Sequence, residues 1–223
     1  TLTLEPNRAF TGFRAGQHLN LPAEIDGRRR PRCYSPASAE SARHIELTIG
    51  RHDGGLVSTY LCDHARPGMI VGLDSVGGDF TLPAVLPRRI LLVSGGSGIT
   101  PVMSMLRTLR ADGFDGEIAF VHYARNATEA CYADELATIT GVRVLHGYTR
   151  AGEGDLTGYF NADHLAAAMP DPSKDAAVFV CGPPALVDAV RAQCPTALSE
   201  SFVPPTFSAP DQAAGGRISF TDS

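Results

Sequence analysis

The 223-residue sequence lacks the features that mark a membrane-spanning or nucleic-acid-binding protein. No apolar run is long enough to cross a bilayer, and no signal peptide is evident. The net charge is −5, and the one basic tract is Arg28-Arg29-Arg30 followed by Arg32. Because nucleic-acid binding requires an extended basic surface, we do not expect nucleic acid as a partner.

The sequence also lacks the cysteine spacing of a metal site. None of its five cysteines forms a Cys-x-x-Cys pair, which disfavours a zinc or iron–sulfur centre within this chain. An odd number of scattered cysteines fits a reducing compartment, so we expect a cytoplasmic protein without a disulfide framework. The seven histidines show no metal-ligand spacing and are interpreted as structural or surface residues, namely His18, His44, His52, His64, His122, His146 and His164.

Both ends of the sequence suggest a fragment of a longer polypeptide. The chain begins at Thr1 without a methionine, already inside an alternating pattern, and another alternating segment, 217–220, lies just before its end. Residues 203–216 are rich in Pro, Ala and Gly and predict a linker.

The periodicity of the sequence changes near residue 88. Up to Pro87, short alternating segments such as 17–21 and 43–50 are separated by Gly and Pro, which predicts a small antiparallel β-barrel with one helix at 57–63. After it, strand patterns alternate with helical ones, which predicts a parallel sheet with covering helices. The predicted strands are 90–93, 117–123, 142–146, 176–181 and 197–202, and the predicted helices are 101–111, 129–139, 162–169 and 184–192.

A glycine-rich turn, Gly95-Gly96-Ser97-Gly98-Ile99-Thr100-Pro101, joins the first of these strands to a helix. Its glycines allow a sharp turn and a close approach to a ligand, and the helix start offers free N–H groups to a phosphate. We expect Thr100 to cap the helix and Pro101 to occupy its first turn. The turn predicts a nucleotide site at the carboxyl end of the strands.

Five motifs in a fixed order identify a resemblance to the ferredoxin–NADP reductase superfamily. They are Arg32-Cys33-Tyr34-Ser35, Gly55-Leu56-Val57-Ser58, the glycine-rich turn, Cys181-Gly182-Pro183 and Glu200-Ser201-Phe202. The resemblance implies a flavin-binding β-barrel over 1–87, a nicotinamide-nucleotide domain over 88–203, and over 204–223 a linker and the start of a ferredoxin-like domain. The first barrel strand is expected to precede Thr1.

The resemblance assigns the flavin site to the first half. It implies that Arg32 pairs with a flavin phosphate, Tyr34 packs on the isoalloxazine ring and Ser35 hydrogen-bonds near flavin N5. Gly55 to Ser58 would offer backbone N–H groups to the diphosphate. Thr48, Ile49 and Gly50 would run alongside the cofactor, which is FAD in most of the family and FMN in some relatives with the same Glu-Ser-Phe ending.

The resemblance assigns the nicotinamide site to the second half. Gly95, Gly96, Gly98, Thr100 and Pro101 match its nucleotide turn, and Cys181, Gly182 and Pro183 lie where the nicotinamide reacts. Thr149 and Arg150, with Arg125, would hold the 2′-phosphate of NADPH, while NADH remains an alternative. Glu200 would help shape the reaction centre, and Phe202 would cover the flavin ring.

One motif departs from the family pattern. The usual Gly-Pro-x-Gly-x-Phe turn before the second domain is Ser75-Val76-Gly77-Gly78-Asp79-Phe80 here, without the proline. The geometry of this turn is therefore not predicted.

The resemblance implies an NAD(P)H oxidoreductase that passes electrons from NADPH through FAD to a [2Fe–2S] centre. It is similar to actinobacterial reductases with a C-terminal [2Fe–2S] domain, whose acceptors are oxygenases or membrane fatty-acid desaturases. Two alternatives remain open at this point. One is the reductase half of a flavohaemoglobin, and the other is a flavin-binding regulatory electron-transfer subunit that never meets free nicotinamide nucleotide.

Overall fold

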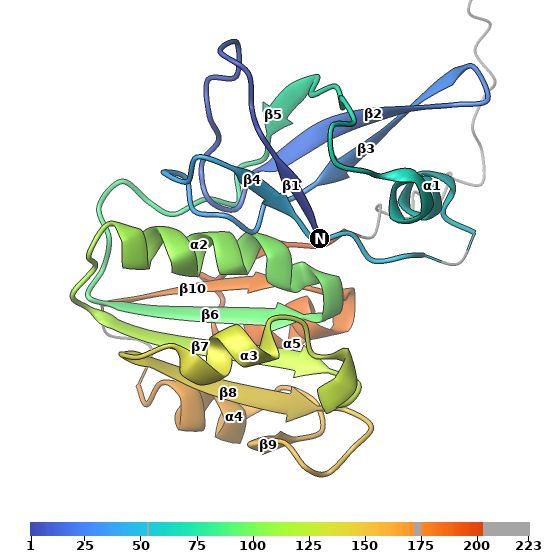
Figure 1. The fold of residues 1–223 in the computed structure, drawn as a ribbon. Coiled ribbons are helices and arrows are strands. Elements are labelled where there is room, and N and C mark those ends of the chain that lie inside the picture. Colours follow the sequence, from blue (N-terminus) through green and yellow to red (C-terminus); the bar gives the residue numbers. More distant parts are fainter. Residues whose placement is uncertain (53, 172–174, 203–223) are drawn as a thin grey trace, which may run out of the picture.

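The computed structural model describes residues 1–52, 54–171 and 175–202, which form two stacked parts (Figure 1). The first part contains two small antiparallel sheets and one helix, and the second is a parallel sheet with helices on both faces. This arrangement confirms the predicted two-part fold class. The boundary at residue 87 stays a prediction, and the expected linker and ferredoxin-like start lie outside the described residues.

The first part is built on the hairpin of β2 (His18–Ile25) and β3 (Arg28–Tyr34). Alternate residues of β2 are buried, as expected for a strand with one face on a core. β5 (Ser75–Gly77) pairs with the other edge of β2, while β1 (Leu2–Leu4) and β4 (Ile45–Leu47) form a separate two-stranded sheet. The apolar segment 69–73 forms no strand and leaves Ile70 almost fully exposed.

A nine-residue helix, α1 (Leu56–His64), packs on this hairpin through Val57 and Leu61. It confirms the helix predicted at 57–63. Its buried side chains join Leu19, Leu21 and Leu47 in a core that belongs to the first part alone.

The second part is a six-stranded parallel sheet in the order β11-β10-β6-β7-β8-β9. Its strands are β6 (Arg89–Gly95), β7 (Glu117–Ala124), β8 (Val142–Tyr148), β9 (Leu156–Thr157), β10 (Ala176–Cys181) and β11 (Leu198–Glu200). Its α-helices are α2 (Ile99–Ala111), α3 (Ala133–Thr138), α4 (Ala162–Ala168) and α5 (Pro184–Gln193), and two 3-10 turns are η1 (Gly96–Gly98) and η2 (Ala127–Glu129).

The helix predicted at 129–139 is shorter in the structure. Asn126 caps η2 by accepting a hydrogen bond from the Glu129 N–H, and Tyr132 then adopts a left-handed backbone with φ 58°. Because a left-handed residue cannot continue a right-handed helix, α3 begins only at Ala133.

The core on the α2 face of the sheet extends into the first part. Leu92, Phe120 and Phe179 of the sheet lie against α2, and Phe80 and Leu82 of the first part belong to the same cluster. α4 and α5 cover the opposite face (Figure 1). α2 therefore lies between the parallel sheet and the first part, and its burial on both sides fixes how the two parts are stacked.

A polar cluster interrupts this apolar face near the carboxyl ends of the strands. Ser94, His122 and His146 stand in register on β6, β7 and β8. Ser94 Oγ and His122 Nδ1 share a hydrogen bond of 2.9 Å. His122 is fully buried, and burial, together with the neighbouring His146, lowers its pKa to about 4.

None of the helices in the described ranges combines the length and apolar character needed to cross a bilayer.

Candidate flavin and nicotinamide site

The end of β3 carries the predicted flavin motif. The Arg32 guanidinium is exposed and donates to the Pro31 carbonyl at 2.7 Å, and it forms no ion pair with a carboxylate among the described residues. Tyr34 is half-buried, and burial raises its pKa. Ser35 is buried, and its Oγ has no hydrogen-bond partner in the described part of the chain. Cys33, which lies between Arg32 and Tyr34, is exposed. Within the described ranges, a guanidinium without a carboxylate partner and a hydroxyl without a hydrogen-bond partner thus lie at one strand end.

The start of α1 supplies backbone donors. Gly55 is its N-cap residue, no side chain of the described residues caps the helix, and its first turn contains no acidic residue. A Cβ on Gly55 would lie 2.5 Å from Ser58 Oγ and 3.0 Å from the His52 carbonyl oxygen, so a larger residue here would require the Ser58 side chain to move. The N–H groups of Leu56, Val57 and Ser58 have no acceptor within the helix, and together with the positive end of the helix dipole they favour an anion here.

The strand-end segment Thr48-Ile49-Gly50 lies beside the same helix and reaches the second part. The carbonyl of Ile49 accepts from Cys62 Sγ of α1 at 3.7 Å. Thr48 Oγ1 is hydrogen-bonded to the Tyr132 hydroxyl, from just before α3, and lies 2.9 Å from Thr1 Oγ1. Gly50 is exposed.

The glycine-rich turn lies at the carboxyl end of β6, as predicted. Gly95 closes the strand, Gly96 adopts a left-handed φ of 55°, and α2 begins at Ile99 with Pro101 in its first turn. The predicted capping role of Thr100 is wrong. Thr100 already lies inside the helix, and its hydroxyl donates to the Ser97 carbonyl at 3.3 Å, while Gly98 is the N-cap without a side-chain cap.

A second turn, Cys181-Gly182-Pro183, touches the first one through the backbone. A Cβ on Gly98 would lie 2.3 Å from the Cys181 carbonyl oxygen, and a Cβ on Gly182 would lie 3.1 Å from the Gly95 nitrogen. The register explains this contact, because Cys181 of β10 stands beside Ser94 of β6. Glycine at these positions therefore holds the two turns together at the edge of the sheet.

Glu200 lies next to Cys181, with which it pairs across β10 and β11. Its Oε2 is buried and has no partner among the described residues, and burial raises its pKa to about 7. Burial, with a further contribution from Glu200, raises the pKa of the Cys181 thiol, so this thiol is neutral at physiological pH. Phe202 follows β11 and is 46% exposed.

His18 is a neighbour of Glu200 that the sequence analysis missed. Its Nδ1 lies 3.8 Å from Glu200 Oε1, and its ring packs against Gly77 and Gly78. The two residues are far apart in the sequence and come from different parts of the fold. No local pattern could have indicated their contact.

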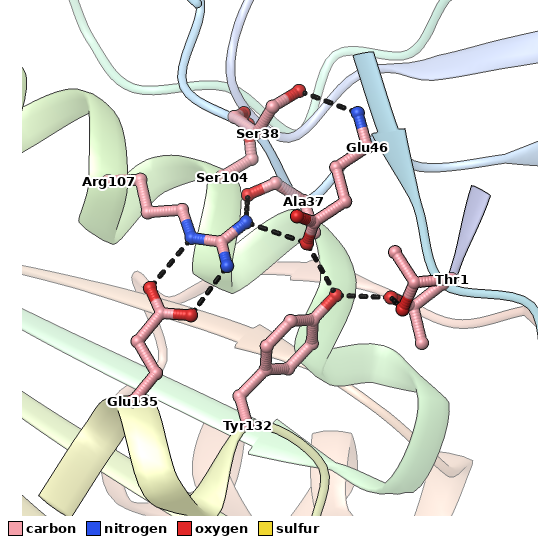
Figure 2. Close-up of polar contacts among 9 residues, drawn as sticks. Thr1, Ala37, Ser38, Glu46, Ser104, Arg107, Tyr132 and Glu135 are labelled. Carbon is pink, nitrogen blue, oxygen red and sulfur yellow. Dashed lines mark hydrogen bonds and ion pairs between the residues drawn. The ribbon is translucent and has the colours of Figure 1, made fainter. Parts of the chain in front are cut away.

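The sequence analysis also missed a polar seam that joins the two parts of the fold (Figure 2). Arg107 of α2 donates to Glu135 of α3 and, from Nη1, to Glu46 of β4 at 2.9 Å and the Ala37 carbonyl at 2.8 Å. The Tyr132 hydroxyl donates to Glu46 at 3.2 Å.

The residues expected at the 2′-phosphate lie together at another point of the carboxyl edge. Arg125 follows β7, and Thr149 and Arg150 follow β8. The Arg150 N–H donates to the Arg125 carbonyl at 3.0 Å, so the two backbones run side by side. Arg125 forms an ion pair with Glu129, whereas Arg150 is exposed.

The residues present fit a flavin diphosphate nucleotide. Ser35 Oγ and Glu200 Oε2 are buried polar atoms without partners in the described part of the chain, which is costly unless a ligand or water satisfies them. The α1 start and Arg32 supply the N–H donors and the positive charge that a diphosphate needs.

Comparison with known proteins agrees with this geometry. Residues 1–81 match the oxidoreductase FAD-binding domain, and residues 92–192 match the oxidoreductase NAD-binding domain. The chain belongs to the ferredoxin–NADP reductase family of flavin oxidoreductases. This family member therefore has an FAD-binding and an NAD(P)-binding domain.

Curated relatives of this family member include three bacterial proteins. It is 36% identical over 193 residues to an NADPH oxidoreductase of Mycobacterium tuberculosis, covering 82% of this chain and 49% of the relative. A flavohemoprotein of Deinococcus radiodurans is 31% identical, covering 86% of this chain and 51% of the relative. A glycine betaine monooxygenase reductase subunit of Pseudomonas aeruginosa is 32% identical, covering 80% and 51%. The chain thus spans about half the length of these relatives.

A solved structure supports the fold. The flavohem-like FAD/NAD-binding domain of a nitric oxide dioxygenase from Vibrio cholerae superposes with a TM-score of 0.78 at 24% identity, covering 91% of each chain.

Proposed function

We propose that this chain transfers electrons from NADPH to FAD and onward to a [2Fe–2S] centre that serves an oxygenase or a fatty-acid desaturase. FAD, when bound, supplies the chemistry that converts a two-electron hydride into single electrons. Residues 1–87 would bind the flavin and residues 88–203 the nicotinamide nucleotide. The observation that carries the proposal is the backbone contact between the Gly98 and Cys181 turns, with Glu200 beside it.

The chain's own residues have distinct tasks in this proposal. Arg32 and the α1 start bind the diphosphate, Tyr34 packs on the flat ring, and Ser35 donates a hydrogen bond to its edge. The paired glycine turns admit the nicotinamide, because glycine leaves the backbone open to close approach. Cys181 and Glu200 line the meeting point, and the raised pKa of Glu200 lets this carboxyl hold or release a proton near neutral pH.

The nucleotide preference rests on Arg125, Thr149 and Arg150. Two guanidinium groups at one edge favour the 2′-phosphate of NADPH over the 2′-hydroxyl of NADH. The name of the mycobacterial relative, NADPH oxidoreductase, agrees with this preference.

Anaerobic reduction tests the core of the proposal. The FAD-loaded protein is mixed separately with NADPH and NADH, and the flavin absorption band is followed. We expect faster bleaching with NADPH. A faster reaction with NADH would keep the reductase but remove the 2′-phosphate role, and a flavin that neither nucleotide reduces would support the regulatory-subunit alternative.

The acceptor is supported by the betaine monooxygenase reductase relative, whose printed name links it to an oxygenase. Its test is reconstituted turnover of the protein with a [2Fe–2S] ferredoxin and an oxygenase or desaturase. Absence of nucleotide-dependent turnover with either acceptor would contradict this part.

A second candidate function is the reductase module of a flavohaemoglobin. The flavohemoprotein relative of D. radiodurans favours it. It predicts a globin segment upstream of Thr1 in the complete reading frame, whereas the first proposal predicts a ferredoxin-like segment after residue 204.

A further inference from the structure

Glu129 stands at the sheet edge where the nucleotide preference is expected to be set. Thr149 and Arg150 follow β8, and their N–H groups donate to the carbonyls of Ala124 and Arg125, each at 3.0 Å. Glu129 ends η2, four residues after Arg125, and its side chain turns back toward this edge. Three charged side chains, Arg125, Glu129 and Arg150, thus share one short stretch of the carboxyl edge.

The Glu129 carboxylate is held in place by two side chains. One oxygen forms the ion pair with Arg125, and the other accepts from Asn126 Nδ2 at 2.9 Å. The Glu129 N–H donates in turn to Asn126 Oδ1 at 3.1 Å, and the Thr128 hydroxyl donates to the same oxygen at 2.8 Å. Asn126 therefore fixes both the backbone and the side chain of Glu129, and the carboxylate faces Arg125 rather than the solvent alone.

A carboxylate at this position acts oppositely on the two nicotinamide nucleotides. A 2′-phosphate needs the Arg125 guanidinium, which Glu129 already occupies, and its negative charge is repelled by the carboxylate. A 2′-hydroxyl carries no charge and can donate a hydrogen bond to a carboxylate. Because the ion pair is about half exposed, it is weak, and a phosphate can displace it without removing the nearby negative charge.

We propose that Glu129 is a specificity-determining residue that weakens binding of the 2′-phosphate and so narrows the preference for NADPH over NADH. This inference rests on the proposed nucleotide site at Arg125, Thr149 and Arg150. It gives a role to the fixed carboxylate that this edge carries beside its two arginines, between the end of β7 and the start of α3.

Calorimetric titration of the FAD-loaded protein with 2′,5′-ADP and with 5′-AMP tests the proposal without any turnover. In Glu129→Gln we expect 2′,5′-ADP to bind about threefold to tenfold more tightly than in the wild type. Binding of 5′-AMP should stay equal or weaken. Glu117→Gln is the matched control, because Glu117 is also a half-exposed glutamate paired with an arginine, Arg89, but lies at the opposite end of β7.

The double variant Arg125→Gln/Glu129→Gln shows whether Glu129 acts through Arg125. If it does, Glu129→Gln should tighten 2′,5′-ADP binding less in the Arg125→Gln background than in the wild type. Equal tightening of 2′,5′-ADP and 5′-AMP in the single variant, or the same gain in Glu117→Gln, would overturn the proposal.

Failure of this inference is distinguishable from failure of the proposed function. If Glu129→Gln binds 2′,5′-ADP as the wild type does while Arg150→Ala binds it more weakly, the nucleotide site stands and the role of Glu129 is overturned. If the wild type binds neither 2′,5′-ADP nor 5′-AMP, the proposed site itself fails and the inference fails with it. Melting curves of each variant verify that the fold is retained.

Discussion

Arg107 of α2 donates a hydrogen bond of 2.9 Å to Glu46 of β4, two residues that lie in different parts of the fold (Figure 2). The same guanidinium binds Glu135 and the Ala37 carbonyl, so one side chain joins three segments. Only 22% of the Arg107 side chain is exposed. The contact is therefore shielded enough from solvent that its loss should lower the stability of the fold.

Replacing Arg107 by Met should destabilise the protein by about 2 kcal/mol, because Glu46 and the Ala37 carbonyl lose a charged donor in a partly buried place. Urea unfolding measures the change. Arg51→Met removes an ion pair to Asp63 that is about half exposed, and it should destabilise the protein much less than Arg107→Met. Equal effects of the two substitutions would contradict a structural role for the seam.

Gly98→Ala should both destabilise the fold and weaken nucleotide binding. The added Cβ would lie 2.3 Å from the Cys181 carbonyl oxygen, a backbone atom that cannot yield without separating the two turns. We expect a loss of about 2 kcal/mol or more. Gly96→Ala has open space around it and bears only the strain of its φ of 55°, about 1 kcal/mol. Thermal unfolding should rank Gly98→Ala as the more damaging change.

Glu200→Gln should stabilise the protein at alkaline pH relative to the wild type. The pKa of Glu200 is raised from 4.5 to about 7, so the folded state holds a proton that the unfolded state releases, and wild-type stability falls as pH rises through this window. Since the carboxyl is incompletely buried, we expect an advantage of about 1–2 kcal/mol at pH 8 and none near pH 4. Chemical unfolding of both proteins at these two pH values measures it, and a difference independent of pH would contradict the prediction.

His122→Asn should reduce the acid sensitivity of the fold. The pKa of His122 is lowered from 6.5 to about 4, so between these values the unfolded chain takes up a proton that the folded chain does not, and wild-type stability falls as pH falls. The wild type should lose up to about 3 kcal/mol from this group. Stability measured from pH 7 to pH 4 should fall less steeply in the variant. His44→Asn, the same substitution at an exposed site, is the control.

The parallel sheet could be predicted from sequence because its signals are local. The run Ile90–Val93 is apolar throughout, as expected for a strand covered on both faces, and the glycine-rich turn follows it directly. The two glycine turns could be placed at one edge because parallel strands share their carboxyl ends.

The remaining features depend on contacts that leave no local pattern. Glu46 and Arg107 are 61 positions apart, and Tyr132 and Glu46 are 86 apart. The pairing of His18 with Glu200 likewise arises only when the two parts are stacked. The assignment of Thr100 as a cap failed for a different reason. The 3-10 turn η1 begins at Gly96 and α2 begins at Ile99, so Thr100 already lies inside the helix.

The strand β3 lies at the edge of its sheet, with β2 as its only partner among the described strands. An unpaired strand edge is a template for pairing with another chain, and long apolar edges promote aggregation. Five of the seven residues of β3 are four arginines and a proline, namely Arg28, Arg29, Arg30, Pro31 and Arg32. Like-charge repulsion between two such edges, and the missing N–H of Pro31, oppose edge-to-edge association. The residue that is expected to hold the flavin phosphate is therefore also one of the charges that keep copies of this protein from joining through their sheets.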